Sequence, residues 1–362
     1  MIKRVFYDII RWFDTHRKLS LVVVLAAACV VLYPRFNRND IAIIRPFVGL
    51  KPGEVSPDIQ NYMNFADYFK HTMPLNSVSI PYSYRPLVPF LASLMPTDSL
   101  LGLIIVNIFS LLLSVISIFF ILKKLEYPYG FRIAGCLLYI ISFPVLYYVS
   151  SGYLDSTALL IIFLVVLATV YKKYLALPAI FLIGALVKEA IIVALPFMLL
   201  YFYQQRKAEK RYTMKFLIVG GLSVALYLAS YYYARSTFGT ASNYIWSPGI
   251  SSIVQNIGRP KTYLSFILSF GVAGFFAALQ FFSDFRKFSE GGKNSIIVFL
   301  KQYAYAPYLA GILASLLLCG YAFLAAYADG RFIWTAYPFM IPLAVKYFHQ
   351  RYSTLPLRKQ SW

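Results

Sequence analysis

Apolar runs long enough to cross a bilayer recur along the whole chain, separated by short loops that carry Lys and Arg. A membrane-spanning helix needs about 20 mostly apolar residues, and somewhat fewer where flanking Lys or Arg side chains reach the interface. With 60% hydrophobic and only 13% charged residues, the 362-residue chain has too little polar surface for one soluble domain. We therefore predict an all-α polytopic membrane protein with about ten transmembrane helices and a long first outer loop. The predicted spans are 19–33, 99–122, 132–150, 156–171, 174–187, 190–204, 213–235, 263–282, 303–326 and 332–348.

The positions of the basic residues predict the orientation of these spans. Cytoplasmic loops of membrane proteins carry an excess of Lys and Arg, so the net charge of +20 is a topology signal here and does not indicate nucleic-acid binding. The pattern predicts cytoplasmic N- and C-termini. The clusters assigned to the cytoplasm are Lys123–Lys124, Lys172–Lys173, Arg206–Arg211, Arg286–Lys287 and Arg358–Lys359.

Residues 174–204 admit two interpretations. A single long helix would place Lys188 and Glu189 in hydrocarbon, at about 2.5–3.5 kcal/mol each, and would put the flanking basic clusters on opposite sides. Two short spans that turn at Lys188 and Glu189 avoid both costs. The sequence therefore predicts a turn at the outer interface.

Two other segments are amphipathic and do not span. Residues 1–18 have apolar side chains at helical spacing, which predicts a helix on the cytoplasmic leaflet. Residues 34–98 are too polar to cross and form the outer loop, in which 59–69 and 87–95 are expected to lie along the membrane surface or to re-enter it. The three cysteines lie inside apolar runs, so neither a disulfide framework nor a Cys/His metal site is indicated. No internal repeat divides the chain, and we treat 1–362 as one domain.

This topology gathers a specific set of charged and aromatic residues at the outer face. Several have a structural alternative: Asp58 and Asp155 are placed to cap helices, and Trp246 to anchor the interface. Lys188 and Glu189 are placed to pair with neighbours across the bundle. The predicted site residues in it are Asp58, Tyr84, Arg85, Asp155, Lys188, Glu189, Trp246 and Arg331, and Asp329 belongs to the same outer segment as Arg331.

These residue types fit the transfer of a sugar from a phosphate carrier to a hydroxyl group. The attacking hydroxyl needs a base, and a carboxylate whose pKa is raised by burial can serve, so Asp58 is the predicted base. A phosphate leaving group is already a stable anion and needs fixed positive charge more than a second acid. Arg85, Lys188 and Arg331 are the predicted phosphate-binding cations, with Tyr84 beside them.

The other members of the set have supporting roles in this interpretation. Asp155 and Glu189 would orient the cations, bind sugar hydroxyls, or hold a divalent metal such as Mg²⁺ or Mn²⁺. Trp246 would stack on a sugar ring. The metal requirement stays open at this point.

Five short motifs, in this order along the chain, resemble bacterial glycosyltransferases of the GT-C class. The motifs are Asp58-Ile59-Gln60-Asn61-Tyr62, Tyr84-Arg85-Pro86-Leu87-Val88-Pro89, Gly152-Tyr153-Leu154-Asp155, Lys188-Glu189, and Arg331-Phe332 followed by Pro338. The resemblance implies a multi-span enzyme of the bacterial cytoplasmic (inner) membrane that uses polyprenyl-phosphate-linked sugars on the outer face. It implies Asp58 as the catalytic residue, Arg331 near the lipid phosphate, and a glycan, lipid or protein as acceptor.

Two other classes of function stay open. A transporter or flippase for a lipid-linked or anionic solute would also need an outward cationic cavity, but transporters tend to show internal repeats and broken or charged helices near mid-membrane. A non-catalytic assembly subunit would not need Asp58, Arg85 and Arg331 together. The sequence contains no phosphate-binding loop, which argues against a cytosolic nucleotide-using site.

Overall fold

The computed structural model describes residues 2–32, 55–208, 213–239, 249–290, 296–325 and 328–352, and these form helices and turns without a β-strand. The first half contains α1 (Ile2–Thr15), α2 (Arg17–Leu32), α4 (Pro57–Phe69), α5 (Leu87–Ser93), α6 (Ser99–Lys124), α7 (Tyr129–Ile140), α8 (Phe143–Tyr148) and α9 (Asp155–Val170). The second half contains α10 (Leu177–Val187), α11 (Ala194–Ala208), α12 (Thr213–Phe238), α13 (Ile250–Ile257), α14 (Pro260–Glu290), α15 (Ile296–Gln302), α16 (Ala306–Ala325), α17 (Arg331–Trp334) and α18 (Tyr337–Tyr352). Short 3₁₀ segments are η2 (Leu75–Ser77), η3 (Tyr82–Tyr84), η4 (Val149–Ser151), η5 (Tyr174–Ala176) and η6 (Glu189–Val193).

Four helices of the described residues are long and apolar enough to cross a membrane, namely α6, α12, α14 and the Ala306–Leu324 part of α16. The helices α7, α9 and Tyr174–Val187 are apolar but shorter. The predicted all-helical membrane architecture is confirmed for these residues, whereas the count of ten spans stays a prediction. Among the predicted spans, 132–150 is split between α7 and α8, and 332–348 is split between α17 and α18.

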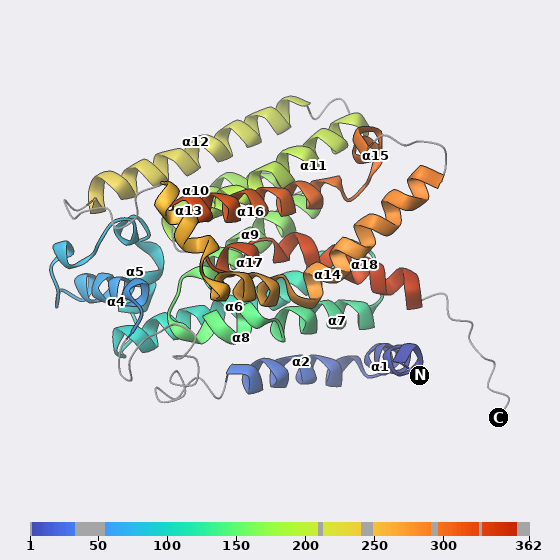
Figure 1. The fold of residues 1–362 in the computed structure, drawn as a ribbon, viewed down its shortest axis with the longest axis horizontal. Helices are drawn as coiled ribbons and strands as arrows, with labels where there is room; N and C mark the ends of the chain where they lie inside the picture. Colours follow the sequence, from blue (N-terminus) through green and yellow to red (C-terminus); the bar gives the residue numbers. More distant parts are fainter. Residues whose placement is uncertain are drawn as a thin grey trace.

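The longer helices run side by side along the long axis of the molecule (Figure 1). Helices α4 and α5 lie together at one end, which we call the α4 end, and α1 lies at the opposite end (Figure 1). Helix α1 docks on the start of α7, where Asp14 Oδ1 accepts a hydrogen bond of 2.7 Å from the Gly130 amide. The predicted helix within 1–18 is therefore present, with Val5, Ile9 and Trp12 exposed on it.

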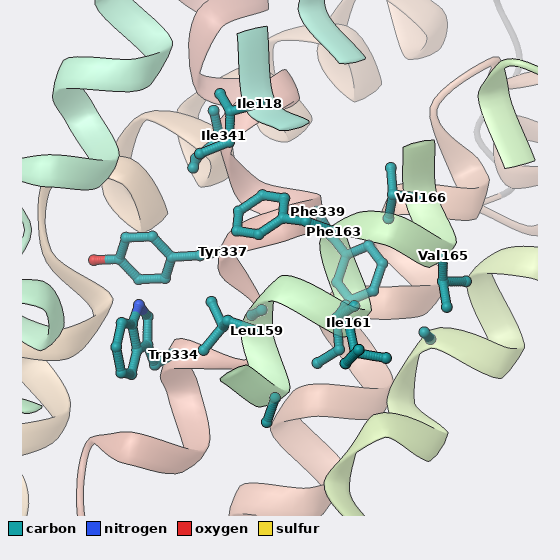
Figure 2. Packing of buried hydrophobic residues seen from close by; sticks show 14 of the residues in the cluster. Ile118, Leu159, Ile161, Phe163, Val165, Val166, Trp334, Tyr337, Phe339 and Ile341 are labelled. Carbon is teal, nitrogen blue, oxygen red and sulfur yellow. The ribbon is translucent and has the colours of Figure 1, made fainter. Parts of the chain in front are cut away.

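Helix α9 is the centre of the bundle and is apolar on all sides, which is typical of a helix with no exposed face. Its Leu159 and Phe163 face Trp334 and Phe339, which belong to α17 and α18 (Figure 2). All four side chains are buried. Since lipid tails are as apolar as these side chains, close packing holds membrane helices together, and here it ties α9 to α17 and α18.

The chain reverses direction after α10, as the two-span interpretation predicts. Helix α10 ends at Val187, and Lys188 has an extended backbone with φ −168° and ψ 137°. At the other end of the pair, the ring of Tyr174 lies 5.2 Å from that of Phe202 in α11. A continuous helix would hold these two rings far apart, so the single-helix alternative is wrong.

Helix α14 has an interruption that the sequence analysis does not anticipate. Gly271 adopts φ 52° and ψ −159° inside the helix, a backbone region that glycine enters far more readily than other residues. The Tyr337 hydroxyl donates a hydrogen bond of 2.9 Å to the Ser269 carbonyl next to the break. The broken helix is thereby fastened to the start of α18.

Candidate functional site

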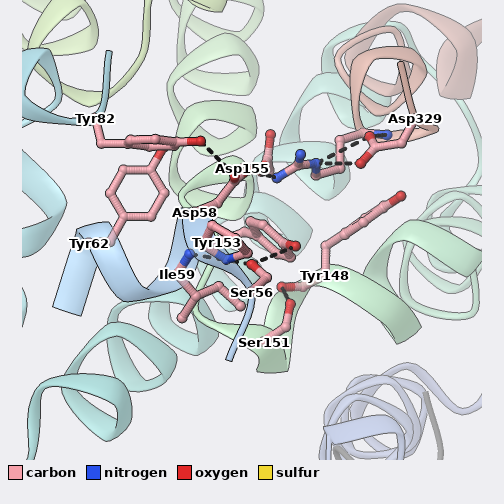
Figure 3. A network of polar contacts seen from close by, with 12 residues as sticks. Ser56, Asp58, Ile59, Tyr62, Tyr82, Tyr148, Ser151, Tyr153, Asp155 and Asp329 are labelled. Carbon is pink, nitrogen blue, oxygen red and sulfur yellow. Dashed lines mark hydrogen bonds and ion pairs between the residues drawn. The ribbon is translucent and has the colours of Figure 1, made fainter. Parts of the chain in front are cut away.

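Asp58 lies in the first turn of α4 with both carboxylate oxygens occupied. Its Oδ2 accepts a hydrogen bond of 3.0 Å from Arg331 Nη1, and its Oδ1 accepts one of 2.6 Å from the Tyr82 hydroxyl (Figure 3). The cap of α4 is Ser56, whose Oγ accepts from the Ile59 amide. Asp58 therefore does not cap α4. Its two oxygens accept hydrogen bonds from Tyr82 and Arg331 instead.

The pKa of Asp58 differs from the sequence-based expectation. Burial raises it, but Arg331 and the Tyr82 hydroxyl stabilise the carboxylate more strongly, so the pKa lies below its ordinary value. The expectation that burial alone would make Asp58 a stronger base is wrong. Nothing in the sequence near Asp58 indicates that a cation and a hydroxyl bind its carboxylate directly.

Arg331 begins α17 and connects two carboxylates. Its Nε donates to both oxygens of Asp329, at 3.1 and 2.9 Å, and its Nη1 to Asp58 (Figure 3). The guanidinium carbon lies 4.2 Å from the centre of the Tyr153 ring, within the range of a cation–π contact. One cation is thus shared by two acids and stacked on an aromatic ring.

The broken helix α14 positions the turn that carries Arg331. The Gly330 amide donates a hydrogen bond of 2.6 Å to Ser265 Oγ. A Cβ atom at Gly330 would meet Ser269 Oγ at 1.9 Å and the Ser265 carbonyl oxygen at 2.4 Å. No side chain fits at this position, so glycine is required for the turn to lie against α14.

Two further ion pairs lie beside these groups. Lys188 Nζ contacts Asp155 Oδ1 at 2.6 Å, and Arg85 binds Glu189 through Nε at 2.9 Å and through a second, short contact from Nη2. Arg85 Nη1 also donates to the Tyr62 hydroxyl at 2.6 Å. The alternative that Lys188 and Glu189 pair with neighbours across the bundle is therefore observed, and their partners are themselves predicted site residues.

Asp155 links the pairs into one network, because it interacts electrostatically with Arg331 and Arg85 as well as with Lys188. No side-chain cap is made at the start of α9, so Asp155 does not act as its N-cap. Together these residues form what we call the Arg331 network. Its members are Asp58, Arg85, Asp155, Lys188, Glu189, Asp329 and Arg331. Four carboxylates face three cations, which leaves an excess of one negative charge when all are ionised.

Two predicted site residues are not in this network. Tyr84 packs against Arg235 of α12, with 5.2 Å between the guanidinium carbon and the ring centre. It therefore lies near Arg85 in sequence but directs its ring to a different cation. Trp246 lies outside the described residues.

Sequence reasoning gave no role to several residues that complete the network. Asp329 lies two positions before Arg331 in the same predicted outer segment, but its sequence context assigned it no role of its own. Tyr62, Tyr82 and Tyr153 gave little signal, because the chain holds 31 tyrosines and tyrosine is common at membrane interfaces for other reasons.

A second, partly buried charge cluster, also missed, lies toward the opposite end of the bundle. Lys346 Nζ contacts Asp284 Oδ2 at 2.8 Å and lies 4.4 Å from the Tyr305 ring centre and 5.0 Å from that of Tyr303. The Tyr303 hydroxyl donates to the same Asp284 oxygen at 2.7 Å, and Tyr127 and Tyr305 join their hydroxyls at 2.8 Å. We call these five residues the Lys346 cluster. The sequence-based site contains only residues of the outer face, so this cluster lies apart from it.

No group of three or more His, Cys, Asp or Glu side chains in the described part of the chain is arranged to hold a metal ion. Comparison with family models, curated proteins and solved structures gives no match. Function is therefore inferred from the chemistry of the Arg331 network, which pairs carboxylates able to accept a proton with cations able to bind an anion.

Proposed function

We propose that the chain is a glycosyltransferase that moves a sugar from a polyprenyl-phosphate carrier to an acceptor hydroxyl. The reaction would take place on the outer face of the bacterial cytoplasmic membrane, with a glycan, lipid or protein as acceptor. This orientation follows from the basic loops predicted to be cytoplasmic, which leave the α4 end outside.

The ion pair between Asp58 and Arg331 carries this proposal. The two residues lie 273 positions apart in sequence, yet their side chains meet at 3.0 Å. Transfer from a phosphate carrier needs a cation for the departing phosphate and a carboxylate for the proton of the attacking hydroxyl. A base and a phosphate-binding arginine in contact satisfy both needs within one site.

The network also suggests how Asp58 gains strength as a base. With Arg331 and Tyr82 on its oxygens it holds protons weakly, since its pKa is lowered. A phosphate bound to Arg331 would share the positive charge of the guanidinium and so weaken its stabilisation of the Asp58 carboxylate. Burial would then raise the pKa of Asp58 toward the range in which a carboxylate accepts a proton from a hydroxyl.

Two observations favour a transporter as the second candidate. Helix α14 is broken at Gly271, and the Lys346–Asp284 pair is a partly buried charge pair between helices α14 and α18. Broken helices and internal charges are typical of transport pathways. A purified chain in vesicles that moves a lipid-linked sugar across the bilayer without transferring the sugar would favour this candidate.

The decisive experiment is sugar transfer from a purified polyprenyl-phosphate sugar by wild type and Asp58→Asn. Asparagine keeps the shape but cannot accept the proton, so turnover should fall by about two to four orders of magnitude while donor binding is retained. Asp67→Asn is the matched control, because Asp67 lies on the same helix and contacts Ser99 outside the network. Near-wild-type turnover of a folded Asp58→Asn protein would show that Asp58 is not the base and would leave Asp155, Glu189 and Asp329 as candidates.

A further inference from the structure

The charge balance of the Arg331 network conflicts with simple binding of an anion. Each of its three cations already contacts a carboxylate, and the four carboxylates leave one excess negative charge. The side chains of Arg331, Asp58 and Asp329 are only 14%, 22% and 15% exposed. Adding a phosphate to such a site places a second uncompensated negative charge in a poorly solvated region, which is costly.

One carboxylate is less compensated than the other three. Asp155 has Lys188 at 2.6 Å, Glu189 has two contacts from Arg85, and Asp58 has the Tyr82 hydroxyl in addition to Arg331. The hydrogen bonds that Asp329 accepts from the described residues all come from Arg331, through its amide and its Nε. Asp329 therefore depends on a cation that it shares with Asp58.

The titratable groups around Asp329 come from several packed elements. Burial raises the pKa of Asp329 above its ordinary value, Arg331 compensates only in part, and the charges of Asp155 and Asp58 raise it further. The groups facing Asp329 are Arg331, Asp58 of α4, Asp155 of α9, Tyr148 of α8, Tyr153, and Cys319 of α16.

We infer that Asp329 takes up one proton when a phosphate group binds at Arg331. This inference rests on the proposed function, since it names how the same site accommodates its lipid-phosphate donor. Protonation removes one negative charge as the phosphate adds one, so the network keeps its charge balance. Protonation also weakens the contact between Asp329 and Arg331 Nε, so this Nε becomes available to a phosphate oxygen.

The inference predicts that affinity for the donor depends on pH. A phosphate at Arg331 raises the pKa of Asp329 further. Donor affinity is therefore highest at pH values below the pKa that Asp329 has in the unbound protein, and it falls as pH rises above that pKa. Uptake of one proton corresponds to about a tenfold increase in Kd per pH unit in that window. Asn at position 329 resembles the protonated acid, so Asp329→Asn should bind independently of pH and at least about tenfold more tightly than wild type at the alkaline end.

The probe is a polyprenyl methyl phosphodiester, because a phosphodiester has no proton to exchange near neutral pH, unlike a phosphate monoester. Its Kd is measured for the full chain in detergent between about pH 5 and about pH 8. Calorimetry in two buffers of different ionisation enthalpy counts the protons taken up by wild type and needs no variant. Asp67→Asn is the control and should keep the wild-type pH dependence.

Three results would overturn the inference. A wild-type Kd that is constant over this range, with no proton uptake in either buffer, excludes it while leaving the proposed function intact. An Asp329→Asn protein that keeps the wild-type pH dependence assigns the proton to another group. Binding no tighter than that of the neutral polyprenol would overturn the proposed function itself, and this outcome is distinct from the other two.

Discussion

The Arg331 network and the Lys346 cluster both bury charge between helices that are distant in sequence, but they are built differently. In the Lys346 cluster, one cation meets one carboxylate, and tyrosine rings and hydroxyls surround the pair. In the Arg331 network, one guanidinium serves two carboxylates, and acids outnumber cations. The first is a closed pair with balanced charge, whereas the second has a shared cation and an excess acid.

This difference indicates what each region can do. Breaking a closed buried pair leaves an uncompensated charge, so such a pair holds its helices in place, here α14 and α18. A shared cation can exchange one partner for another while it keeps a counterion throughout. The Arg331 network is therefore where we propose that an anionic ligand binds, with proton uptake at Asp329, whereas the Lys346 cluster is suited to holding the opposite end of the bundle together.

The largest effect is expected from Arg331→Ala. The change removes the cation proposed to bind the phosphate and leaves Asp58 and Asp329 without their shared partner, so sugar transfer should fall by about 10³-fold or more, with weaker donor binding. Arg331→Lys should recover only part of each, because an ammonium cannot make the forked contact. Sugar transfer and donor affinity should be measured separately for each variant. A folded Arg331→Ala protein with normal donor binding would contradict the role of Arg331 in binding the phosphate.

Single changes in the Lys346 cluster should affect stability more than transfer. Lys346→Met leaves Asp284 buried without its cation and should lower the free energy of unfolding by about 3–5 kcal/mol. Adding Asp284→Leu removes the stranded charge and should restore much of the loss. Thermal unfolding in detergent compares the variants, and a single variant of wild-type stability that has lost sugar transfer would give this cluster a functional role instead.

Tyr82→Phe provides a finer test of the Arg331 network. It deletes the hydroxyl that donates to Asp58 and leaves Arg331 in place. Loss of a hydrogen bond to a charged group is worth about 1.5–3 kcal/mol, so the pKa of Asp58 should rise and the acid limb of the pH–rate profile should move to higher pH. An unchanged profile would show that this hydroxyl does not set the ionisation of Asp58.

The smallest effect is expected at an exposed pair on the same helix as Asp284. Arg286 and Glu290 contact at 2.8 Å, but their side chains are 82% and 60% exposed. Solvent-exposed pairs contribute little, so Arg286→Ala should change the free energy of unfolding by less than about 0.5 kcal/mol. A loss as large as that of Lys346→Met would mean that burial does not explain the contrast between pairs on this helix.

Much of the architecture is readable in the sequence. Apolar runs locate the helices, and the cost of placing Lys188 and Glu189 in hydrocarbon predicts the reversal that α10 and α11 make. The same reasoning brings Asp58, Arg85, Asp155, Lys188, Glu189 and Arg331 to one end of the chain's helices. Hydropathy and charge placement can do this because lipid imposes one strong rule on every residue, independent of its neighbours.

Only the tertiary structure decided which of these groups pair and how the pairing shifts their pKa values. The sequence predicts a carboxylate with a raised pKa at Asp58, but contact with Arg331 and Tyr82 lowers it, and the pKa that burial raises is that of Asp329. The sequence also gave no indication of the break at Gly271 or of the Lys346–Asp284 pair. Each depends on contacts between segments far apart in the chain, and the energy of a buried charge is determined by atoms within a few ångströms of it, whereas composition and periodicity report only average surroundings.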